Sequence, residues 1–334
     1  MTKDLKVSII MLTYNHSDYI IEAIEGVLMQ KTNFEFELIV SDDCSTDKTK
    51  SIVNEYLIQN NCRRVNFVSH NINLGINENF DYALNLIQGE YVALCDGDDY
   101  WTDPHKLQMQ VDFMDRNENV SLICTERSIF IQKTQTITKY ETESTGNIEL
   151  YNFQEALSCA EVYTLTSLFR AQSLREYQKL RSVNKELNYL DYSLWIFLAN
   201  KGFTAKIFKD TAMYRILENS ATHSSDICNK WKLKKKYFSD FQILKNIVDS
   251  SNLEFINNQE YLRARSFFIF SVYCGDTEFI NEFRTIFLKN KDYYRLYIFK
   301  LIQIIPIFCK LMFILQRAKS SLQYRLSGLK HLIH

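Results

Sequence analysis

Residues 7–40 read VSIIMLTYNHSDYIIEAIEGVLMQKTNFEFELIV and contain two apolar runs with a helical pattern between them. The first run, residues 7–12, is rich in β-branched side chains and predicts a strand that is buried on both faces. Apolar residues then recur at helical spacing over residues 18–30, and residues 36–40 form the second apolar run. A strand, a helix and a strand within forty residues predict a parallel βαβ unit.

The same alternation continues along the next sixty residues. It predicts a helix near residues 46–59, which Ser45 or Thr46 could cap, a strand at 65–69, a helix near 77–87 and a strand at 91–95. These elements are typical of a doubly wound sheet, which binds ligands at the carboxyl ends of its strands. The polar residues that directly follow each strand are therefore the candidate functional residues.

The rest of the chain loses this strict alternation. Strand-like stretches occur at 121–131 and 162–169, and Gly202 can close a helix predicted over 191–200. From about residue 226 the pattern is mostly helical. We expect an α/β fold with a doubly wound, mostly parallel sheet flanked by helices and a helical C-terminal extension. The expected divisions are residues 1–115 and 116–225, two halves of one domain, and 226–334.

Composition and charge narrow the class of protein. The chain has 334 residues, 46% of them hydrophobic and 24% charged, and a net charge of −1. A nucleic-acid partner is not expected, because phosphate neutralisation needs a surplus of Lys and Arg. The charge is unevenly spread: residues 291–334 carry eight basic residues and one acid, a net of +7, which leaves −8 for the rest.

The cysteines and the N-terminus indicate a cellular compartment. Eight cysteines occur without a C-x-x-C spacing, which predicts buried thiols in a reducing environment rather than a zinc site or a disulfide framework. The first apolar run is too short for the core of a signal peptide. We therefore expect a cytoplasmic protein.

An acidic segment without basic residues is the sharpest chemical feature. Between Val65 and His105 there is no Lys or Arg, and three of the seven acids, Asp96, Asp98 and Asp99, directly follow a predicted strand. Carboxylates held this close raise one another's pKa unless a positive charge separates them. Oxygen ligands on a tight turn suit Mg²⁺ or Mn²⁺, with a phosphate-bearing substrate completing the shell. The alternative is an ordinary Asp-Gly turn with solvated acids.

Three successive motifs carry a resemblance to a known family. They are VSIIMLTYNHSDYIIEAIEGVLMQ (7–30), ELIVSDDCSTDKT (37–49) and NINLGINENFDYALNLIQGEYVALCDGDDYW (71–101). In order, spacing and position at strand ends, they resemble the nucleotide-sugar-binding half of the family 2 inverting glycosyltransferases of the GT-A fold, of the bacterial surface-polysaccharide type. The resemblance covers about the first 115 residues and implies that residues 116–225 bind the acceptor.

The resemblance implies roles for four residues at the strand ends. Tyr14 would stack on the nucleotide base, Asp43 would hydrogen-bond it, Asp96 would contact the ribose and the metal, and Asp98 would be the main metal ligand. The residues alone leave other interpretations open. Tyr14 is equally suited to the edge of a core, and Asp42 or Asp43 could cap the following helix. Gly75 suits either a positive-φ loop near the sugar or a plain turn.

The segment NYLDYSLW (188–195) resembles the family segment in which an acid opens a helix beneath the acceptor. Asp191 is therefore the expected catalytic base, which takes the proton of the acceptor hydroxyl. Asp is also a preferred helix N-cap, although the residue three positions on, Leu194, does not complete a capping box. Both roles are compatible with one side chain.

Other residues near these motifs remain open. Arg215 could face the donor phosphates or pair with an acid. The family segment often has a histidine two residues after this arginine, where this chain has Leu217, and His223 comes too late to replace it. Thr164, Thr166 and Ser167 could contact the acceptor sugar, but β-propensity explains a Thr-rich stretch equally well.

The C-terminal tail poses a membrane question. Residues 296–315 are very apolar, but Lys300, Gln303, Pro306 and Lys310 interrupt them, so they fall short of the ~20-residue apolar span of a transmembrane helix. The surrounding positive charge favours an interfacial helix on the anionic inner face of the cell membrane. A helix that packs on the catalytic domain is the alternative.

The expected function is metal-dependent, inverting transfer of a hexosyl or N-acetylhexosaminyl group. The donor would be a nucleotide-diphosphate sugar, with UDP-sugars the first choice, and the acceptor a glycan or a lipid-linked saccharide. The alternatives are a sugar-phosphate nucleotidyltransferase and a membrane-associated, non-catalytic glycan- or nucleotide-binding protein. The first usually has a glycine- and basic-rich loop after its first strand, which Thr13-Tyr14-Asn15-His16 does not resemble.

Overall fold

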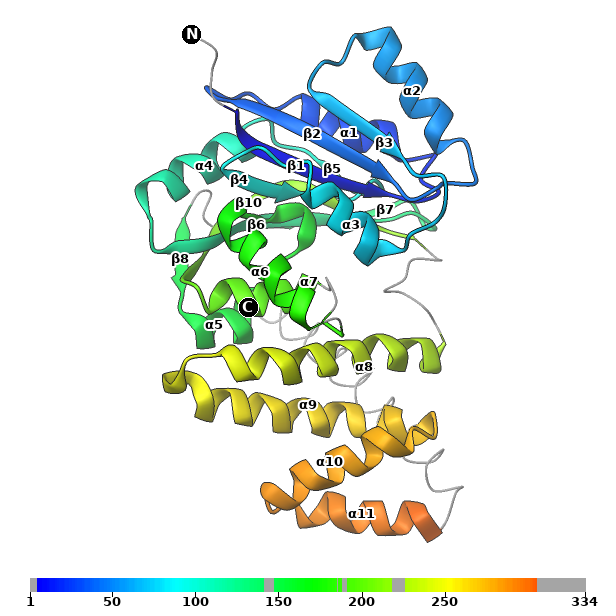
Figure 1. The fold of residues 1–334 in the computed structure, drawn as a ribbon, viewed down its shortest axis with the longest axis vertical. Coiled ribbons are helices and arrows are strands. Elements are labelled where there is room, and N and C mark those ends of the chain that lie inside the picture. Colours follow the sequence, from blue (N-terminus) through cyan, green and yellow to red (C-terminus); the bar gives the residue numbers. More distant parts are fainter. Residues whose placement is uncertain (1–4, 141–146, 185, 188–190, 218–225, 305–334) are drawn as a thin grey trace. The chain divides into compact units, whose positions relative to one another are not determined.

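The computed structural model describes residues 5–140, 147–184, 186–187, 191–217 and 226–304. The chain divides into two compact units, Met1–Ser220 with Ile247–Asp249 and Ala221–Asn246 with Ser250–His334. Figure 1 shows the elements along the chain.

In the first unit strands and helices alternate strictly up to β4, and beyond it they follow one another in no regular order. In chain order its elements are β1 (Leu5–Thr13), α1 (Ile20–Leu28), β2 (Glu35–Asp42), α2 (Thr49–Asn60), β3 (Val65–Ser69), α3 (Ile76–Leu84), β4 (Tyr91–Leu94), β5 (Tyr100–Trp101), α4 (Lys106–Arg116), β6 (Val120–Ile131), β7 (Thr136–Thr138), β8 (Ile148–Tyr151), α5 (Phe153–Cys159), a 3₁₀ turn (Thr164–Thr166), β9 (Leu168–Arg170), α6 (Ala171–Val183), α7 (Asp191–Ala199) and β10 (Phe203–Ile216).

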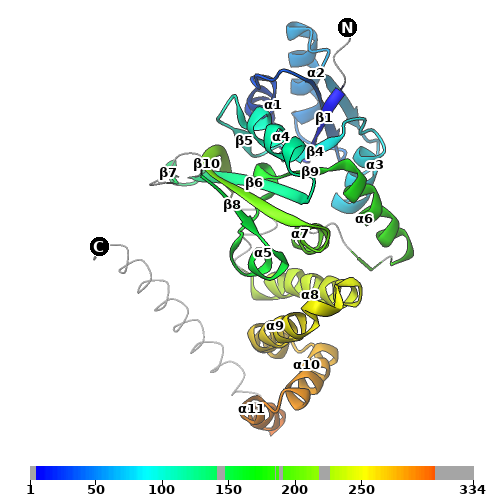
Figure 2. The same ribbon diagram turned by 90° about the vertical axis from the view of Figure 1, so that its left-hand side faces the viewer.

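One mixed sheet carries the whole unit, in the strand order β3-β2-β1-β4-β9-β6-β10-β5. The strands β1 to β4 run parallel, whereas β9 is antiparallel to both of its neighbours, β4 and β6. Helices cover both faces: α1 and α4 lie on one side of the first strands, and α3 and α6 lie on the other (Figure 2). The expected doubly wound α/β fold is confirmed.

The central strand β1 is buried because it has neighbours on both edges and helices on both faces. Val7, Ile9 and Met11 are fully buried in the main core, together with Tyr91 and Ala93 of β4. A parallel strand covered on both faces needs a continuous apolar run, which the sequence supplies. The core therefore fixes the carboxyl ends of β1, β2 and β4 side by side.

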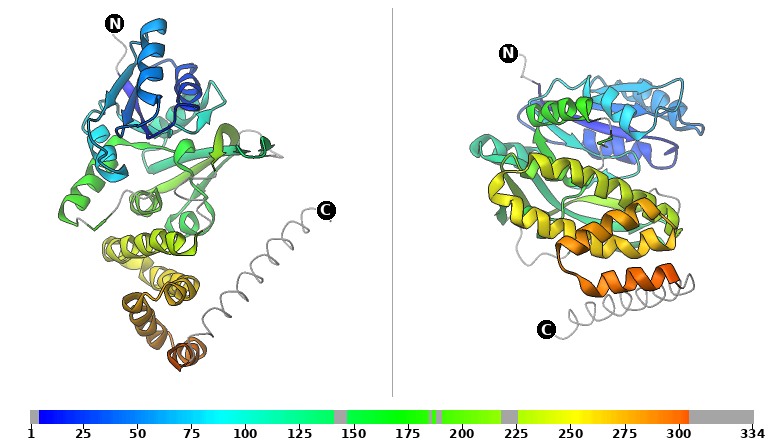
Figure 3. Two further views of the ribbon diagram at one scale, coloured as in Figure 1. Left: turned by 90° about the vertical axis from the view of Figure 1, so that its right-hand side faces the viewer. Right: turned by 60° about the horizontal axis from the view of Figure 1, so that its bottom comes forward.

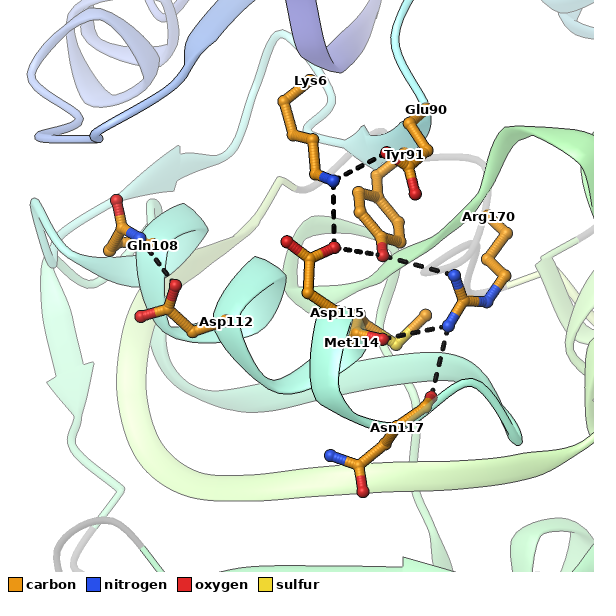
Figure 4. Close-up of polar contacts among 9 residues, drawn as sticks. All are labelled: Lys6, Glu90, Tyr91, Gln108, Asp112, Met114, Asp115, Asn117 and Arg170. Carbon is orange, nitrogen blue, oxygen red and sulfur yellow. Dashed lines mark hydrogen bonds and ion pairs between the residues drawn. The ribbon is translucent and has the colours of Figure 1, made fainter.

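A polar network ties the opposite, amino-terminal edge of these strands (Figure 4). The hydroxyl of Tyr91 donates to Asp115 over 2.7 Å, and Arg170 donates to that hydroxyl and to the backbone carbonyl of Met114. Lys6 adds an ion pair of 3.0 Å with Asp115. Burial and the bond to Asp115 raise the pKa of Tyr91. These contacts join β1, β4, α4 and β9 at the edge away from the strand ends that form the candidate site.

A close approach of α1 to β5 holds the segment that follows β4. A Cβ atom at Gly26 would lie 2.8 Å from the backbone nitrogen of Trp101, so only glycine fits there. Trp101 is itself buried, and its indole N–H donates to the carbonyl of Leu165 over 2.8 Å. The short strand β5 is thereby fixed just after Asp98 and Asp99.

Several local expectations are wrong at the ends of elements. Neither Ser45 nor Thr46 caps α2. Asp47 instead accepts the backbone N–H of Thr49 over 2.9 Å, near the start of that helix. Gly202 does not end α7 with a positive φ; a Cβ there would lie 2.4 Å from the carbonyl oxygen of Asn119, so the glycine permits a close backbone approach.

The predicted strand at 162–169 is only partly formed. Residues Thr164–Thr166 make a 3₁₀ turn, and the strand is confined to β9. The hydroxyl of Thr166 donates to the carbonyl of Tyr163, and that of Ser167 donates to the carbonyl of Thr164. The side chains satisfy the turn, which a period-two pattern does not reveal.

The expectation that the thiols are buried holds for only part of the set. Among the seven described cysteines only Cys95 and Cys124 are buried, and Cys159 and Cys228 are exposed. Burial raises the pKa of Cys124 to about 12.

The second unit is helical where it is described (Figure 3). It contains α8 (Ile227–Leu244), two 3₁₀ turns (Lys245–Ile247, shared at its end with the first unit, and Ser250–Asn252), α9 (Leu253–Tyr273), α10 (Thr277–Lys289) and α11 (Tyr293–Ile304). α8 packs on α9, α9 on α10 and α10 on α11. Edge-to-face aromatic contacts form its core, where Phe283 contacts Trp231, Phe238 and Phe279.

Among the described helices, none combines the length and the apolarity that spanning a bilayer requires. Most of the tail for which an interfacial helix is expected, residues 305–334, lies outside the described residues, as does His223.

A buried lysine in α4 gives a prediction about pH. Lys106 is fully buried; its ammonium donates to Gln110 over 2.7 Å and lies 4.3 Å from the ring centroid of Trp101. Burial lowers its pKa to about 7 from 10.5. Between these values the unfolded chain binds the proton and the folded chain does not, so stability rises with pH.

We therefore expect the free energy of unfolding of the wild type, relative to Lys106→Met, to rise between about pH 7 and pH 10 by roughly 1.4 kcal/mol per pH unit. Urea titrations at three pH values measure it. Lys48→Met, at an exposed position, is the control and should show no such trend. A constant difference between wild type and Lys106→Met across this range would contradict the prediction.

Candidate functional site

Three loops meet at the carboxyl ends of β1, β2 and β4. The backbone N–H of Gly97 donates to the carbonyl of Leu12 over 2.9 Å, and that of Asp43 donates to the carbonyl of Thr13 over 2.9 Å. The loop after β1 is thus bonded to the loops after both neighbouring strands. The structure therefore brings together the segments that hold Tyr14, Asp43, Asp96 and Asp98.

The loop after β1 presents Tyr14 to solvent. Asn15 adopts a left-handed conformation with φ of 58°, which Asn tolerates better than most residues. Its side-chain oxygen accepts the backbone N–H of Thr46 over 2.8 Å, and its own N–H donates to Ser45. Tyr14 is 44% exposed.

Asp43 organises the next loop from a buried position. Its carboxylate accepts the backbone N–H groups of Leu74 over 2.6 Å and Gly75 over 2.9 Å. Gly75 has φ of +84°, so the expected positive-φ loop is confirmed. Asp43 does not cap α2, nor does Asp42, which accepts hydrogen bonds from Ser45 and Ser69.

The turn after β4 concentrates negative charge. Burial, with the charges of Asp98 and Asp191 added, raises the pKa of Asp96 to about 7. Burial and Asp98 also raise the pKa of Asp99 well above its usual range. Asp191, the first residue of α7, is therefore within electrostatic reach of this turn, although almost a hundred residues separate it in the chain.

Gly97 lets the turn lie against the first loop. Its φ is not in the left-handed region, but a Cβ atom would lie 2.9 Å from both Thr13 Oγ1 and His16 Nδ1. Neither of these buried atoms has a hydrogen-bond partner among the described residues. Burial lowers the pKa of His16, against the opposing charge of Asp98. Two unused polar atoms thus border the acidic turn.

Arg215 of β10 holds the turn from the other side. Its backbone N–H donates to the carboxylate of Asp99 over 2.7 Å, and its Nε donates to the backbone carbonyl of Asp98 over 2.8 Å. The guanidinium also pairs with Glu22 of α1 at 2.5 Å and donates to Gln132 at 2.8 Å. Of the two roles left open for Arg215, pairing with an acid is the one found.

Sequence reasoning missed this anchor because its partners are distant in the chain. Residue 215 follows the turn by more than a hundred positions, and only the pairing of β10 with β5 brings them together. The sequence marked Asn15 as a polar residue after a strand, but it did not predict the hydrogen bond that Asn15 accepts from the backbone N–H of Thr46. Thr166 and Ser167, two candidates for sugar contact, are instead fully buried.

The donor set fits a hard divalent cation. Asp96 and Asp98 offer carboxylate oxygens on one turn, and no described Lys or Arg side chain forms an ion pair with either. Within the described part of the chain, no three His, Cys, Asp or Glu residues are placed to hold a metal ion together. Mg²⁺ is usually bound through one or two carboxylates and the phosphates of a substrate, which matches this arrangement.

Solved structures match the fold. S. aureus TarS 1–349 in complex with UDP-GlcNAc superposes with a TM-score of 0.53 at 16% identity, over 86% of this chain and 92% of that one. The mannosyltransferase PcManGT from Pyrobaculum calidifontis, in complex with GDP-Man and Mn²⁺, gives 0.53 at 14% identity, over 80% and 75%. The fold is therefore that of the GT-A glycosyltransferases.

Sequence comparison specifies the family. The family model "Glycosyl transferase family 2" matches residues 8–178. TuaG of Bacillus subtilis, named a putative teichuronic acid biosynthesis glycosyltransferase, is 30% identical over 231 residues, 69% of this chain and 84% of TuaG. The chain belongs to glycosyl transferase family 2.

Two further relatives show how far the likeness extends. An uncharacterized protein of Mycobacterium tuberculosis is 42% identical over 115 residues, which make up 34% of this chain and only 33% of that protein. The Escherichia coli protein WfaP, named UDP-Glc:alpha-D-GlcNAc-diphosphoundecaprenol beta-1,3-glucosyltransferase, is 28% identical over 60% of this chain and 72% of its own length.

The anchoring role of Arg215 is testable by a charge-conserving change. We expect Arg215→Lys to lower the free energy of unfolding by about 3 kcal/mol, because an ammonium cannot span the Asp98 carbonyl, Glu22 and Gln132 together. Arg64→Lys is the matched control, since Arg64 pairs with Glu35 at 3.1 Å on the surface and should lose less than about 1 kcal/mol. Urea unfolding measures both, and equal losses would refute the anchor.

Proposed function

We propose that this protein is a metal-dependent, inverting glycosyltransferase. It moves a hexosyl or N-acetylhexosaminyl group from a nucleotide-diphosphate sugar to a hydroxyl of a glycan or a lipid-linked saccharide. The observation that carries the proposal is the acidic turn at the end of β4, where the carboxylate of Asp96 lies within electrostatic reach of Asp191 at the start of α7. A donor with a diphosphate and an acceptor with a hydroxyl need these two kinds of acid.

The donor is bound by the loops at the strand ends. Tyr14 stacks on the base with its exposed ring. Asp43 accepts an N–H of the base; two backbone N–H groups already use its carboxylate, and a carboxylate has about four acceptor positions. Asp96 contacts the ribose. UDP is the first-choice nucleotide, in line with the UDP-GlcNAc bound by TarS and the UDP-Glc in the name of WfaP.

Asp98, with Asp96, holds the cation. When bound, Mg²⁺ or Mn²⁺ neutralises charge on the leaving diphosphate. Burial, and after it the charge of Asp98, raises the pKa of Asp96 to about 7, and a cation held by both carboxylates would offset both effects. The Mn²⁺ that accompanies GDP-Man in the PcManGT complex supports this assignment.

Asp191 is the general base. It takes the proton from the acceptor hydroxyl while that oxygen forms a bond to the anomeric carbon, and the bond from that carbon to the diphosphate breaks on the opposite face. One proton and one sugar are transferred, and the configuration inverts. Asp191 lies at an exposed position at the start of α7.

The basic tail places the enzyme at its acceptor. Residues 291–334 carry a net charge of +7, and a lipid-linked saccharide such as the one in the name of WfaP resides on a membrane. We propose peripheral binding to an anionic inner membrane face. Neutralising Arg317, Lys319, Arg325 and Lys330 to Gln should reduce flotation with vesicles that contain phosphatidylglycerol, and not alter it with neutral vesicles. Unchanged flotation with the anionic vesicles would contradict tail binding.

Two substitutions test the catalytic proposal against a panel of nucleotide sugars with Mg²⁺ or Mn²⁺. Asp98→Ala should lower metal-dependent turnover by about 10²-fold or more, because the leaving group loses its charge partner. Asp191→Asn should lower transfer by about 10²–10⁴-fold and leave donor binding intact. Asp112→Asn, on α4, is the control.

Calorimetry and a coupled assay for released nucleoside diphosphate provide the readouts. If no nucleotide sugar binds in the presence of metal, the proposed function fails. If Asp191→Asn transfers at the wild-type rate, only the assignment of the base is wrong.

A further inference from the structure

A pocket lies beside the helix that begins with Asp191. It has a volume of about 230 Å³, and α5, α7, β6 and β10 surround it. The residues that α7 contributes are Tyr192, Trp195, Ile196 and Ala199. This spacing defines one face of a helix, so the pocket runs along α7 for roughly 10 Å, from a point one residue after the proposed base.

The pocket combines an apolar floor with a few polar groups. Its apolar residues are Leu122, Ala156, Leu157, Val162, Ile196 and Ala199. Glu161 also lines it and has φ of +40°, a conformation that non-glycine residues adopt rarely. Strained backbone of this kind gathers at binding sites more than elsewhere.

Some of the lining residues hold buried polar atoms. The indole nitrogen of Trp195 and the hydroxyl of Thr204 have no hydrogen-bond partner among the described residues. By contrast, Ser158 and Cys159, which also line the pocket, donate to backbone carbonyls of their own helix. A buried donor without a partner costs free energy, which a ligand that bonds it restores.

We infer that this pocket binds the acetamido group of an N-acetylated sugar in the acceptor. The inference rests on the proposed function, in which an acceptor saccharide places its reacting hydroxyl at Asp191. An acetamido group has a methyl for the apolar floor, a carbonyl that accepts from the Trp195 N–H, and an N–H that donates to the Thr204 hydroxyl. The pocket thus selects an acceptor whose sugar carries an acetamido group close to the reacting hydroxyl.

Other occupants match these walls less well. A hexose without the acetamido group presents hydroxyls to six apolar residues and leaves them without partners. A polyprenyl chain suits the floor but leaves the nitrogen of Trp195 and the hydroxyl of Thr204 buried and unbonded. Thr166 and Ser167 of the neighbouring segment cannot take the role, because their hydroxyls already bond the local backbone.

Binding of two matched probes tests the inference on the full-length protein. The probes are the methyl β-glycosides of N-acetylglucosamine and of glucose, followed by saturation-transfer NMR and by titration. Thr204→Val removes the hydroxyl with little change in shape. Ala156→Phe places a large side chain at a half-buried position of the pocket wall and so fills the pocket. Thr136→Val, at an exposed position of β7, is the matched control.

We expect the wild type and Thr136→Val to bind the N-acetylated probe about tenfold or more tightly than the plain one. Thr204→Val should weaken the N-acetylated probe by about five- to tenfold without weakening the plain probe, and Ala156→Phe should abolish the preference. In the saturation-transfer spectra, the acetamido methyl should receive the strongest signal.

Equal binding of the two probes by the wild type would overturn the inference, as would a preference that survives Ala156→Phe in a protein whose melting curve matches the wild type. Nucleotide-sugar binding, measured without acceptor on the same samples, separates the two proposals. Its absence in the wild type would count against the proposed function. Its presence beside equal probe binding would count against the acetamido pocket alone.

Discussion

The crowding of three acids, Asp96, Asp98 and Asp99, in one turn at the end of β4 is the constraint on which the rest of the structure around the strand ends depends. Burial, and after it the repulsion between neighbouring carboxylates, raises the pKa of Asp96 to about 7 and that of Asp99 well above its usual range. Among the described residues, no Lys or Arg relieves this repulsion by forming an ion pair with Asp96 or Asp98, the carboxylates that would hold a metal. Arg215 instead holds the turn through the carboxylate of Asp99 and the backbone carbonyl of Asp98. The negative charge of the Asp96 and Asp98 carboxylates is therefore left for a cation to neutralise.

That arrangement explains several features outside the turn. Arg215 reaches it from the last strand, so β10 must pair with β5 directly after the acids. β5 in turn lies against α1, where Gly26 allows contact with the backbone of Trp101, and Gly97 allows the turn to approach the loop after β1. Two glycines that look unremarkable in the sequence are therefore positions of close packing, and neither has a positive φ.

The sequence predicted what depends on local pattern, and it missed what depends on contacts between distant segments. The buried strands β1, β2 and β4 were clear because a parallel strand covered on both faces is mostly apolar. The pattern places the cap of α2 at Ser45 or Thr46, but those hydroxyls bond to Asn15 in the loop after β1, and it is Asp47 that accepts the backbone N–H of Thr49 near the start of the helix. The contact of Arg215 with Glu22 depends on the strand order, which local pattern does not reveal.

The same distinction applies to the two sides of the reaction. The loops proposed to bind the donor follow strands directly, so residue type and position in the sequence were enough to mark Tyr14, Asp43, Asp96 and Asp98 as candidates. The pocket that we infer to bind the acceptor lies among α5, α7, β6 and β10, and the residues that line it are mostly apolar. Nothing in their local pattern distinguishes them from an ordinary core. What distinguishes them is that the indole nitrogen of Trp195 and the hydroxyl of Thr204 are buried beside a pocket and have no hydrogen-bond partner among the described residues. Buried polar atoms without a partner are rare in proteins, and a ligand that bonds them is one explanation of such a pair.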